Sequence, residues 1–135
     1  MSSVSNISVV IPLYNKASEI ELTLCSVLMQ SVQPREIIVV DDGSTDGSAE
    51  IVERLATPIV RLIRQQNQGV SAARNRAMRE ATGEWVALLD GDDMWGTDYL
   101  KSVAAMIERW PGCGAYGTGF IPRKDGDISF YSYRD

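Results

Sequence analysis

An acidic stretch, residues 90–93 (DGDD), directly follows residues 84–89 (EWVALL), whose apolar character predicts a buried strand. Three carboxylates within four residues repel one another and lose hydration, so a chain tolerates them where a hard cation neutralises their charge. Mg²⁺ and Mn²⁺ prefer one or two carboxylates together with phosphate oxygens and water. The stretch therefore predicts a metal-assisted phosphate site. The alternative is an acidic strand-to-helix loop in which Asp93 or Thr97 caps the next helix.

A second pair of acids, Asp41 and Asp42, ends another apolar run and precedes residues 43–47 (GSTDG). Asp46 is readily explained as a helix cap, but Asp41 and Asp42 lie before the glycine, at the strand end. A carboxylate only accepts hydrogen bonds. Asp42 could therefore receive the ring N–H of uracil, thymine or guanine, but it could not pair with the acceptor N3 of cytosine. If Asp42 reads a base, cytidine nucleotides are disfavoured.

Two other polar residues are candidates for nucleotide binding. Tyr14 lies just beyond the first apolar run and offers a ring for a base to stack on, although a Tyr that caps the core is an equal alternative. Arg74 falls in the first turn of a predicted helix, where a cation opposes the helix dipole and needs an anion nearby. That anion is either Asp90 or Asp92 in a structural pair, or a substrate phosphate. Two arginines further along are interpreted as solvated surface charges: Arg76 and Arg79.

Composition narrows the class of protein. The chain has 135 residues, of which 44% are hydrophobic, enough for the core of one domain. Its net charge of −5 argues against nucleic acid as a partner. No apolar run approaches the roughly 18–20 residues of a membrane span, and residues 1–6 do not resemble a secretory signal. We expect a cytoplasmic protein that would reach the inner face of a membrane only through a partner or another segment.

The cysteine and histidine content excludes several chemistries. The chain has no His, so His-containing zinc sites and His-based catalysis are excluded. Cys25 and Cys113 lie in apolar patterns and form no CxxC pair, so we expect both to be buried free thiols in a reducing compartment.

Hydrophobic runs that alternate with amphipathic ones predict a three-layer α/β/α domain with a mostly parallel sheet. Pro12 is expected to end the first strand, Ser18 and Glu21 to form a capping box, and Gly83 to end the third helix. The predicted strands cover residues 7–11, 36–40, 59–63, 84–89 and 114–118. The predicted helices begin near Ser18, Ser44 or Thr45, Ser71 and Thr97.

The domain prediction treats residues 1–135 as one unit, with residues 7–118 as its core. Residues 124–127 (KDGD) are a hairpin signal between residues 119–121 and 128–131, and residues 119–135 would lead to a further, acceptor-binding segment. No G-x-G-x-x-G follows the first strand and no P-loop sequence occurs, which disfavours a tightly held NAD and P-loop chemistry. A phosphatase with an aspartyl nucleophile would place its D-x-D after the first strand, whereas the acidic stretch here follows the fourth, which disfavours that enzyme class.

Four sequence blocks resemble the nucleotide-binding half of a family 2 glycosyltransferase with the GT-A fold. The blocks are residues 8–15 (SVVIPLYN), 38–48 (IVVDDGSTDGS), 67–75 (NQGVSAARN) and 83–93 (GEWVALLDGDD). They occur in the expected order, on the predicted strand ends, and the resemblance covers residues 8–111. One such block would be weak evidence, but the four together are highly specific.

The resemblance implies a nucleotide-diphosphate sugar as donor, UDP- or dTDP-linked, and a saccharide or lipid-linked acceptor. Asp92, with Asp90, would bind Mn²⁺ or Mg²⁺ that bridges the diphosphate. Pro12 and Tyr14 would flank the base, and Asp42 would hydrogen-bond to it. The nucleotide-binding residues implied in this way are Pro12, Tyr14, Asn15, Asp42, Gly69, Arg74, Asp90 and Gly91.

In the family, an Asp general base lies in a later segment, so the resemblance implies no catalytic residue within this chain and a base beyond Asp135. The chain is then expected to bind the donor and to transfer little sugar alone. An alternative is a catalytically silent nucleotide-sugar-binding module, which the intact acids disfavour. A sugar nucleotidyltransferase would carry a Gly-rich signature that is missing here. An exposed sheet edge would also allow two copies to associate.

Overall fold

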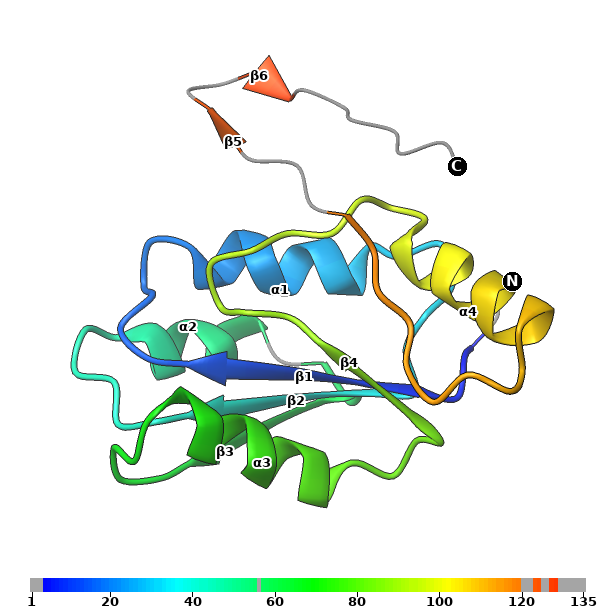
Figure 1. Ribbon diagram of the computed structural model, residues 1–135. Helices are drawn as coiled ribbons and strands as arrows, with labels where there is room; N and C mark the ends of the chain where they lie inside the picture. The colour runs from blue at the N-terminus through cyan, green and yellow to red at the C-terminus, as the bar shows by residue number, and fades with distance from the viewer. Residues whose placement is uncertain (1–3, 56, 120–122, 125–126, 129–135) are drawn as a thin grey trace.

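The computed structural model describes residues 4–55, 57–119, 123–124 and 127–128. The elements up to residue 109 form an α/β/α sandwich (Figure 1). Four parallel strands lie in the order β3-β2-β1-β4. The strands are β1 (Ile7–Leu13), β2 (Glu36–Asp41), β3 (Val60–Arg64) and β4 (Trp85–Leu88). The helices are α1 (Ile20–Leu28), α2 (Ser48–Leu55), α3 (Val70–Glu80) and α4 (Tyr99–Arg109). The predicted three-layer architecture is confirmed.

Helices cover the two faces of the sheet unequally. Alternate residues of β1, such as Val9 and Ile11, pack with α1, α2 and α4 in the larger core cluster. Val10 points to the other face and packs with Ala73 and Ala77 of α3, so the small inner face of this helix lies close to the sheet. Figure 1 shows α3 alone on its side of the sheet. The loops at the ends of β1 and β2 therefore follow strands that are almost completely buried.

Pro12 does not end β1, which continues to Leu13 alongside β2. The Val10 carbonyl accepts a hydrogen bond from the Leu89 N–H, so this edge of β1 faces β4. Two residues later, Pro12 reaches the same edge, but β4 pairs with β1 only as far as Val10. The missing N–H of proline therefore costs no bond in the ladder, which is how a central strand tolerates it.

The helix starts differ from their predicted caps. The predicted capping box is absent: α1 begins at Ile20, and the Ser18 hydroxyl donates to the Glu19 side chain. The start of α2 is Ser48 rather than Ser44 or Thr45, because the Asp46 carboxylate accepts the Ser48 N–H at 3.0 Å. Helix α3 starts at Val70, one residue before Ser71 and without a side-chain cap.

The predicted strand over residues 114–118 is wrong, because this segment is irregular. The hairpin is confirmed: β5 (Arg123–Lys124) and β6 (Asp127–Ile128) pair antiparallel. Its predicted flanking segments at residues 120–121 and 129–131 lie outside the described residues. Both cysteines are free, but Cys25 is only half-buried and Cys113 is exposed, so the expectation of buried thiols is wrong.

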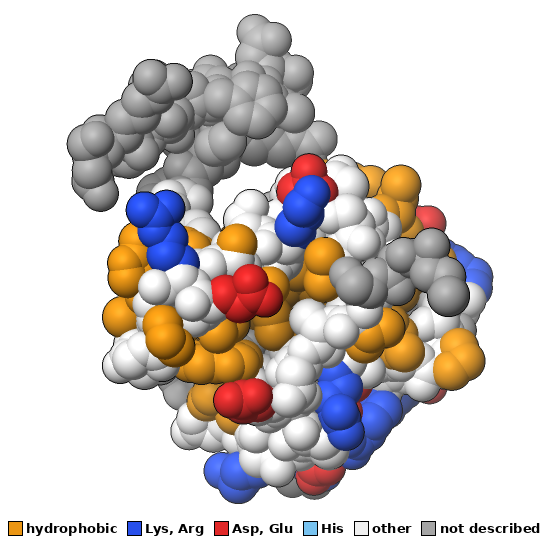
Figure 2. Space-filling model, turned by 90° about the vertical axis from the view of Figure 1, so that its right-hand side faces the viewer, with side chains coloured by type: hydrophobic (Ala, Val, Ile, Leu, Met, Phe, Trp, Pro, Cys, Tyr) orange, Lys and Arg blue, Asp and Glu red, His pale blue; other side chains and the backbone are white. Residues whose placement is uncertain are grey.

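The charge distribution on the surface and the character of the helices bear on possible partners. On the face where the strands begin, basic and acidic side chains are interspersed with apolar ones (Figure 2). Among the helices that the structure describes, none has the length and apolar character needed to cross a lipid bilayer.

Gly83 is required by a close approach rather than by the end of a helix. Helix α3 ends at Glu80, and a Cβ on Gly83 would lie 2.7 Å from the Ser8 Oγ and 2.9 Å from the Asn6 carbonyl oxygen. We expect Gly83→Ala to lower the free energy of unfolding by about 1–3 kcal/mol, because backbone must shift to admit the methyl group. Urea unfolding measures this. Gly112→Ala is the control, since nothing lies within 4 Å there, and equal losses in both variants would refute the steric explanation.

Candidate functional site

The carboxyl ends of β1, β2 and β4 meet the start of α3 at one edge of the sheet. The chain moves from β1 outward through β2 and β3, and then returns to place β4 on the other side of β1. Ligands of open α/β sheets bind in the crevice at such a switch of direction. A pocket of about 450 Å³ lies here. Of the residues expected to bind nucleotide or metal, all but Asn15 line it: Pro12, Tyr14, Asp42, Gly69, Arg74, Asp90, Gly91 and Asp92.

The two acids after β4 each pair with a cation from another element. Arg74 of α3 donates from Nη2 to Asp90 Oδ1 at 2.5 Å. Lys16, from the loop after β1, places Nζ 3.1 Å from Asp92 Oδ2, and this hydrogen bond raises the pKa of the lysine. The anion that Arg74 needs is thus Asp90 in this structure. The pocket thus holds two acids and two cations, which suits an anionic ligand that binds together with a metal ion.

Asp90 and Asp92 could bind a metal ion whose other ligands come from a bound molecule and from water. Asp93 is exposed, but some loss of hydration, together with the charges of Asp92 and Asp90, raises its pKa, so repulsion within the stretch is incompletely relieved. Within the described residues no group of three or more His, Cys, Asp or Glu could hold an ion. Asp90 and Asp92 would therefore hold Mg²⁺ or Mn²⁺ only together with phosphate oxygens and water, the ligand set that these ions prefer.

Asp42 is almost completely buried, with 2% of its surface exposed, and anchors the loop between β3 and α3. Its Oδ1 accepts hydrogen bonds from Gln65 Nε2 at 2.8 Å and from the Gln68 N–H at 2.9 Å. Its Oδ2 accepts the Gly69 N–H at 2.9 Å. A carboxylate has about four acceptor positions, so one is left for a base. The anchoring of this loop was not foreseen from the sequence.

Tyr14 and Gly91 have distinct roles in shaping the pocket. Tyr14 is 49% exposed, which favours an available stacking surface over a core-capping role. Gly91 is buried, and a Cβ there would lie 3.2 Å from the Pro12 carbonyl oxygen. The Gly91 carbonyl also accepts the Thr23 hydroxyl at 3.1 Å. The acidic loop is thereby held against the end of β1.

Asn15 lies beside the pocket rather than in its lining. It adopts a left-handed backbone conformation, with φ of 49°, which asparagine tolerates better than most residues. Its Oδ1 accepts the Thr45 N–H at 2.8 Å, and its own N–H donates to Ser44 Oγ at 3.0 Å. Asn15 therefore ties the loop after β1 to the loop after β2.

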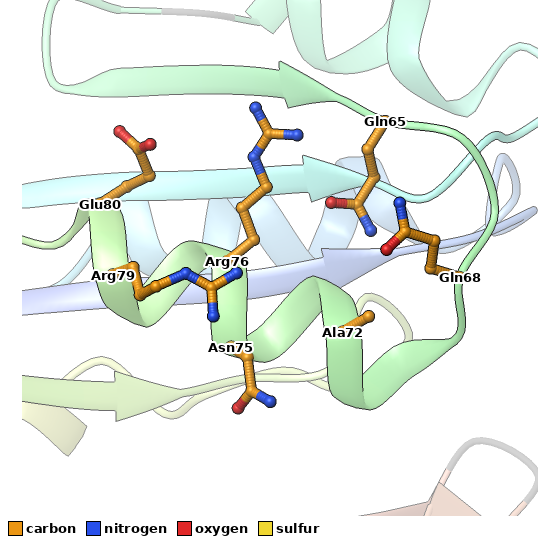
Figure 3. A pocket seen from close by; sticks show the side chains of 7 residues that line it. All are labelled: Gln65, Gln68, Ala72, Asn75, Arg76, Arg79 and Glu80. Atoms are coloured by element: carbon orange, nitrogen blue, oxygen red, sulfur yellow. The ribbon is translucent and has the colours of Figure 1, made fainter.

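Sequence reasoning missed Lys16 and Asn67, both of which line the pocket. A single lysine after a turn has no spacing that separates it from a surface charge, so only its contact with Asp92 reveals it. A second hollow of about 450 Å³ lies beside α3 on the far side of the Gln65–Gly69 loop (Figure 3). It contains none of the predicted site residues, so the first pocket is the candidate functional site.

Comparison with known proteins decides the family. The profile described as glycosyl transferase family 2 matches residues 8–132. The chain belongs to this family. Its similarity to solved structures, described next, also confirms the GT-A fold.

Among curated relatives, the glycosyltransferase YibD of Escherichia coli (strain K12), itself described as uncharacterized, is 45% identical over 80% of this chain. The chain spans about a third (32%) of the length of YibD. The S. aureus TarS 1–349 structure in complex with UDP-GlcNAc has a TM-score of 0.73 and 30% identity, over 84% of this chain and 37% of TarS 1–349. The mannosyltransferase PcManGT of Pyrobaculum calidifontis, in complex with GDP-Man and Mn²⁺, has a TM-score of 0.71 and 35% identity, over 76% of this chain and 32% of its own.

Proposed function

We propose that this family 2 chain is the donor-binding part of an inverting, metal-dependent glycosyltransferase. The donor is a UDP- or dTDP-linked sugar, and the acceptor is a saccharide or a lipid-linked saccharide. The observation that carries the proposal is the pocket at the switch point, where Asp90 and Asp92 face Arg74 and Lys16. The nucleotide-sugar and Mn²⁺ complexes of the two structural neighbours support it.

In this proposal each group serves the departure of a nucleoside diphosphate. A divalent ion, when bound by Asp92 and Asp90, offsets the charge that develops on the diphosphate. Arg74 and Lys16 donate to phosphate oxygens once the acids are engaged elsewhere, and the exposed Tyr14 ring stacks on the base. Asp42 holds Gln68 and Gly69 against the pocket and uses its remaining acceptor position for a base N–H. The general base that activates the acceptor hydroxyl belongs to a later segment.

Thermal unfolding of the chain with UDP, dTDP, GDP and CDP, each with and without Mn²⁺, tests this function. We expect UDP or dTDP to raise Tm only when the metal is present, and CDP to have little effect, because its N3 cannot pair with Asp42. A larger Tm shift with GDP than with UDP or dTDP would indicate a GDP-linked donor in place of the proposed one. No shift with any nucleotide would overturn the donor site.

Lys16 is expected to compete with the metal and to assist the diphosphate. Without the Lys16 ammonium group, the negative charge of Asp92 has no partner, so Lys16→Met should bind Mn²⁺ alone about twofold to fivefold more tightly. With Mn²⁺ saturating, the same variant should bind UDP about fivefold to tenfold more weakly, because a phosphate loses its donor. Calorimetric titration measures both affinities, with Lys101→Met on α4 as the charge-matched control. A change of the same sign in both titrations would refute the two roles.

A further inference from the structure

The second hollow has a basic lining within an acidic protein. Arg76 and Arg79 of α3 line it together with Gln65 and Gln68 of the loop after β3. Figure 3 shows Arg76 extending from α3 across the sheet toward β3, with the carboxamides of Gln65 and Gln68 turned toward each other. Arg76 is half-buried, whereas Arg79 is exposed, as expected from the sequence, and lies along α3 at the rim of the hollow (Figure 3). The chain as a whole carries a net charge of −5, so two arginines lining one hollow are unexpected.

Neither arginine is neutralised within the part of the chain that the structure describes. The acid that lines the same hollow, Glu80, is already bound to Arg61, with Nη2 2.8 Å from its Oε2. Arg76 and Arg79 make no ion pair or hydrogen bond with any described residue. Arg76 is also half-buried, so part of its hydration has been lost without a compensating anion.

We propose that this hollow binds the phosphate group of a small molecule, independently of the donor pocket. Two guanidinium groups and the Gln68 carboxamide offer more N–H donors than the two oxygens of a carboxylate can accept. A phosphate has three or four acceptor oxygens and can take a bidentate pair from each arginine. The site is distinct from the donor pocket, because the Asp42 carboxylate contacts the Gln65–Gly69 loop from the donor side.

The test is an NMR titration of the ¹⁵N-labelled chain with inorganic phosphate at constant ionic strength. The readouts are the side-chain N–H signals of Arg76, Arg79 and Gln68, which report on this hollow. We expect saturable shifts with phosphate and weaker ones with acetate. In the double variant Arg76→Gln/Arg79→Gln, the Gln68 shift should be lost or weakened about tenfold or more, because the strong charge-assisted donors are gone.

The matched control is Arg54→Gln/Arg109→Gln, which removes the same two charges from helices α2 and α4. It should change the affinity reported by Gln68 less than about twofold, because only the long-range field of the protein changes. The proposal is overturned if Gln68 shows no saturable shift in the unmodified chain. It is also overturned if the two double variants weaken phosphate binding equally, since that indicates attraction by net charge alone.

Discussion

Asp92→Asn is expected to abolish the metal-dependent stabilisation of the chain by UDP or dTDP. The substitution keeps the size of the side chain but removes the charge that would attract a divalent ion. A ligand at 100 times its dissociation constant adds about 2.7 kcal/mol to the free energy of unfolding, which corresponds to a Tm shift of several degrees. We expect this shift in the unmodified chain and none in the variant, as measured by thermal unfolding with nucleotide and Mn²⁺.

Asp93→Asn is the matched control for Asp92→Asn. It removes the same charge one residue away, from an exposed side chain that does not line the pocket. This variant should keep most of the nucleotide-dependent shift, because Asp90 and Asp92 remain in the pocket. Equal loss in both variants would indicate that the pocket needs total negative charge rather than a specific ligand. Full retention in Asp92→Asn would exclude Asp92 as the metal ligand.

The architecture could be predicted because apolar periodicity reports directly on burial. The β-branched runs that form β1 and β2 are completely or almost completely buried, and the small face of α3 packs on them as expected. Helix starts could not be predicted as well, because several polar residues compete for each cap. At α2 the Asp46 carboxylate takes the Ser48 N–H, and Ser44 instead receives a hydrogen bond from Asn15. The contact with Asn15 comes from a distant loop and leaves no local pattern.

The candidate site could be predicted where the chemistry of a residue conflicts with its position. Acids at the end of an apolar strand are such a conflict, and this marks Asp42, Asp90 and Asp92. The partners of these acids carry no comparable signal. Lys16 is an ordinary surface residue until the end of β1 brings it to Asp92, and Gln65 is an ordinary loop residue until it donates to Asp42.

Asp42→Asn should destabilise the chain by about 2–4 kcal/mol even without ligand, because a buried acceptor of three hydrogen bonds is replaced. An amide offers one acceptor oxygen, and its NH₂ group would face the backbone N–H of either Gln68 or Gly69, which needs an acceptor. Urea unfolding measures the loss. Gln65→Ala removes only one of the three bonds and leaves both backbone contacts, so it should cost about 1 kcal/mol. A loss below about 0.5 kcal/mol in Asp42→Asn would refute the anchoring role.

Nucleotide binding by the same variant separates anchoring from base reading. If Asp42 acts only by holding Gln68 and Gly69 in place, Asp42→Asn should weaken UDP, dTDP and GDP alike and leave their ranking unchanged. If its remaining acceptor position also reads a base N–H, the preference over CDP should collapse, because an asparagine N–H can donate to the N3 of cytosine. Calorimetry at a temperature where the variant is folded gives its affinity for each of the four nucleotides. Since three acceptor positions are already occupied, we expect the general weakening to be the larger effect and the change in base preference to be superimposed on it.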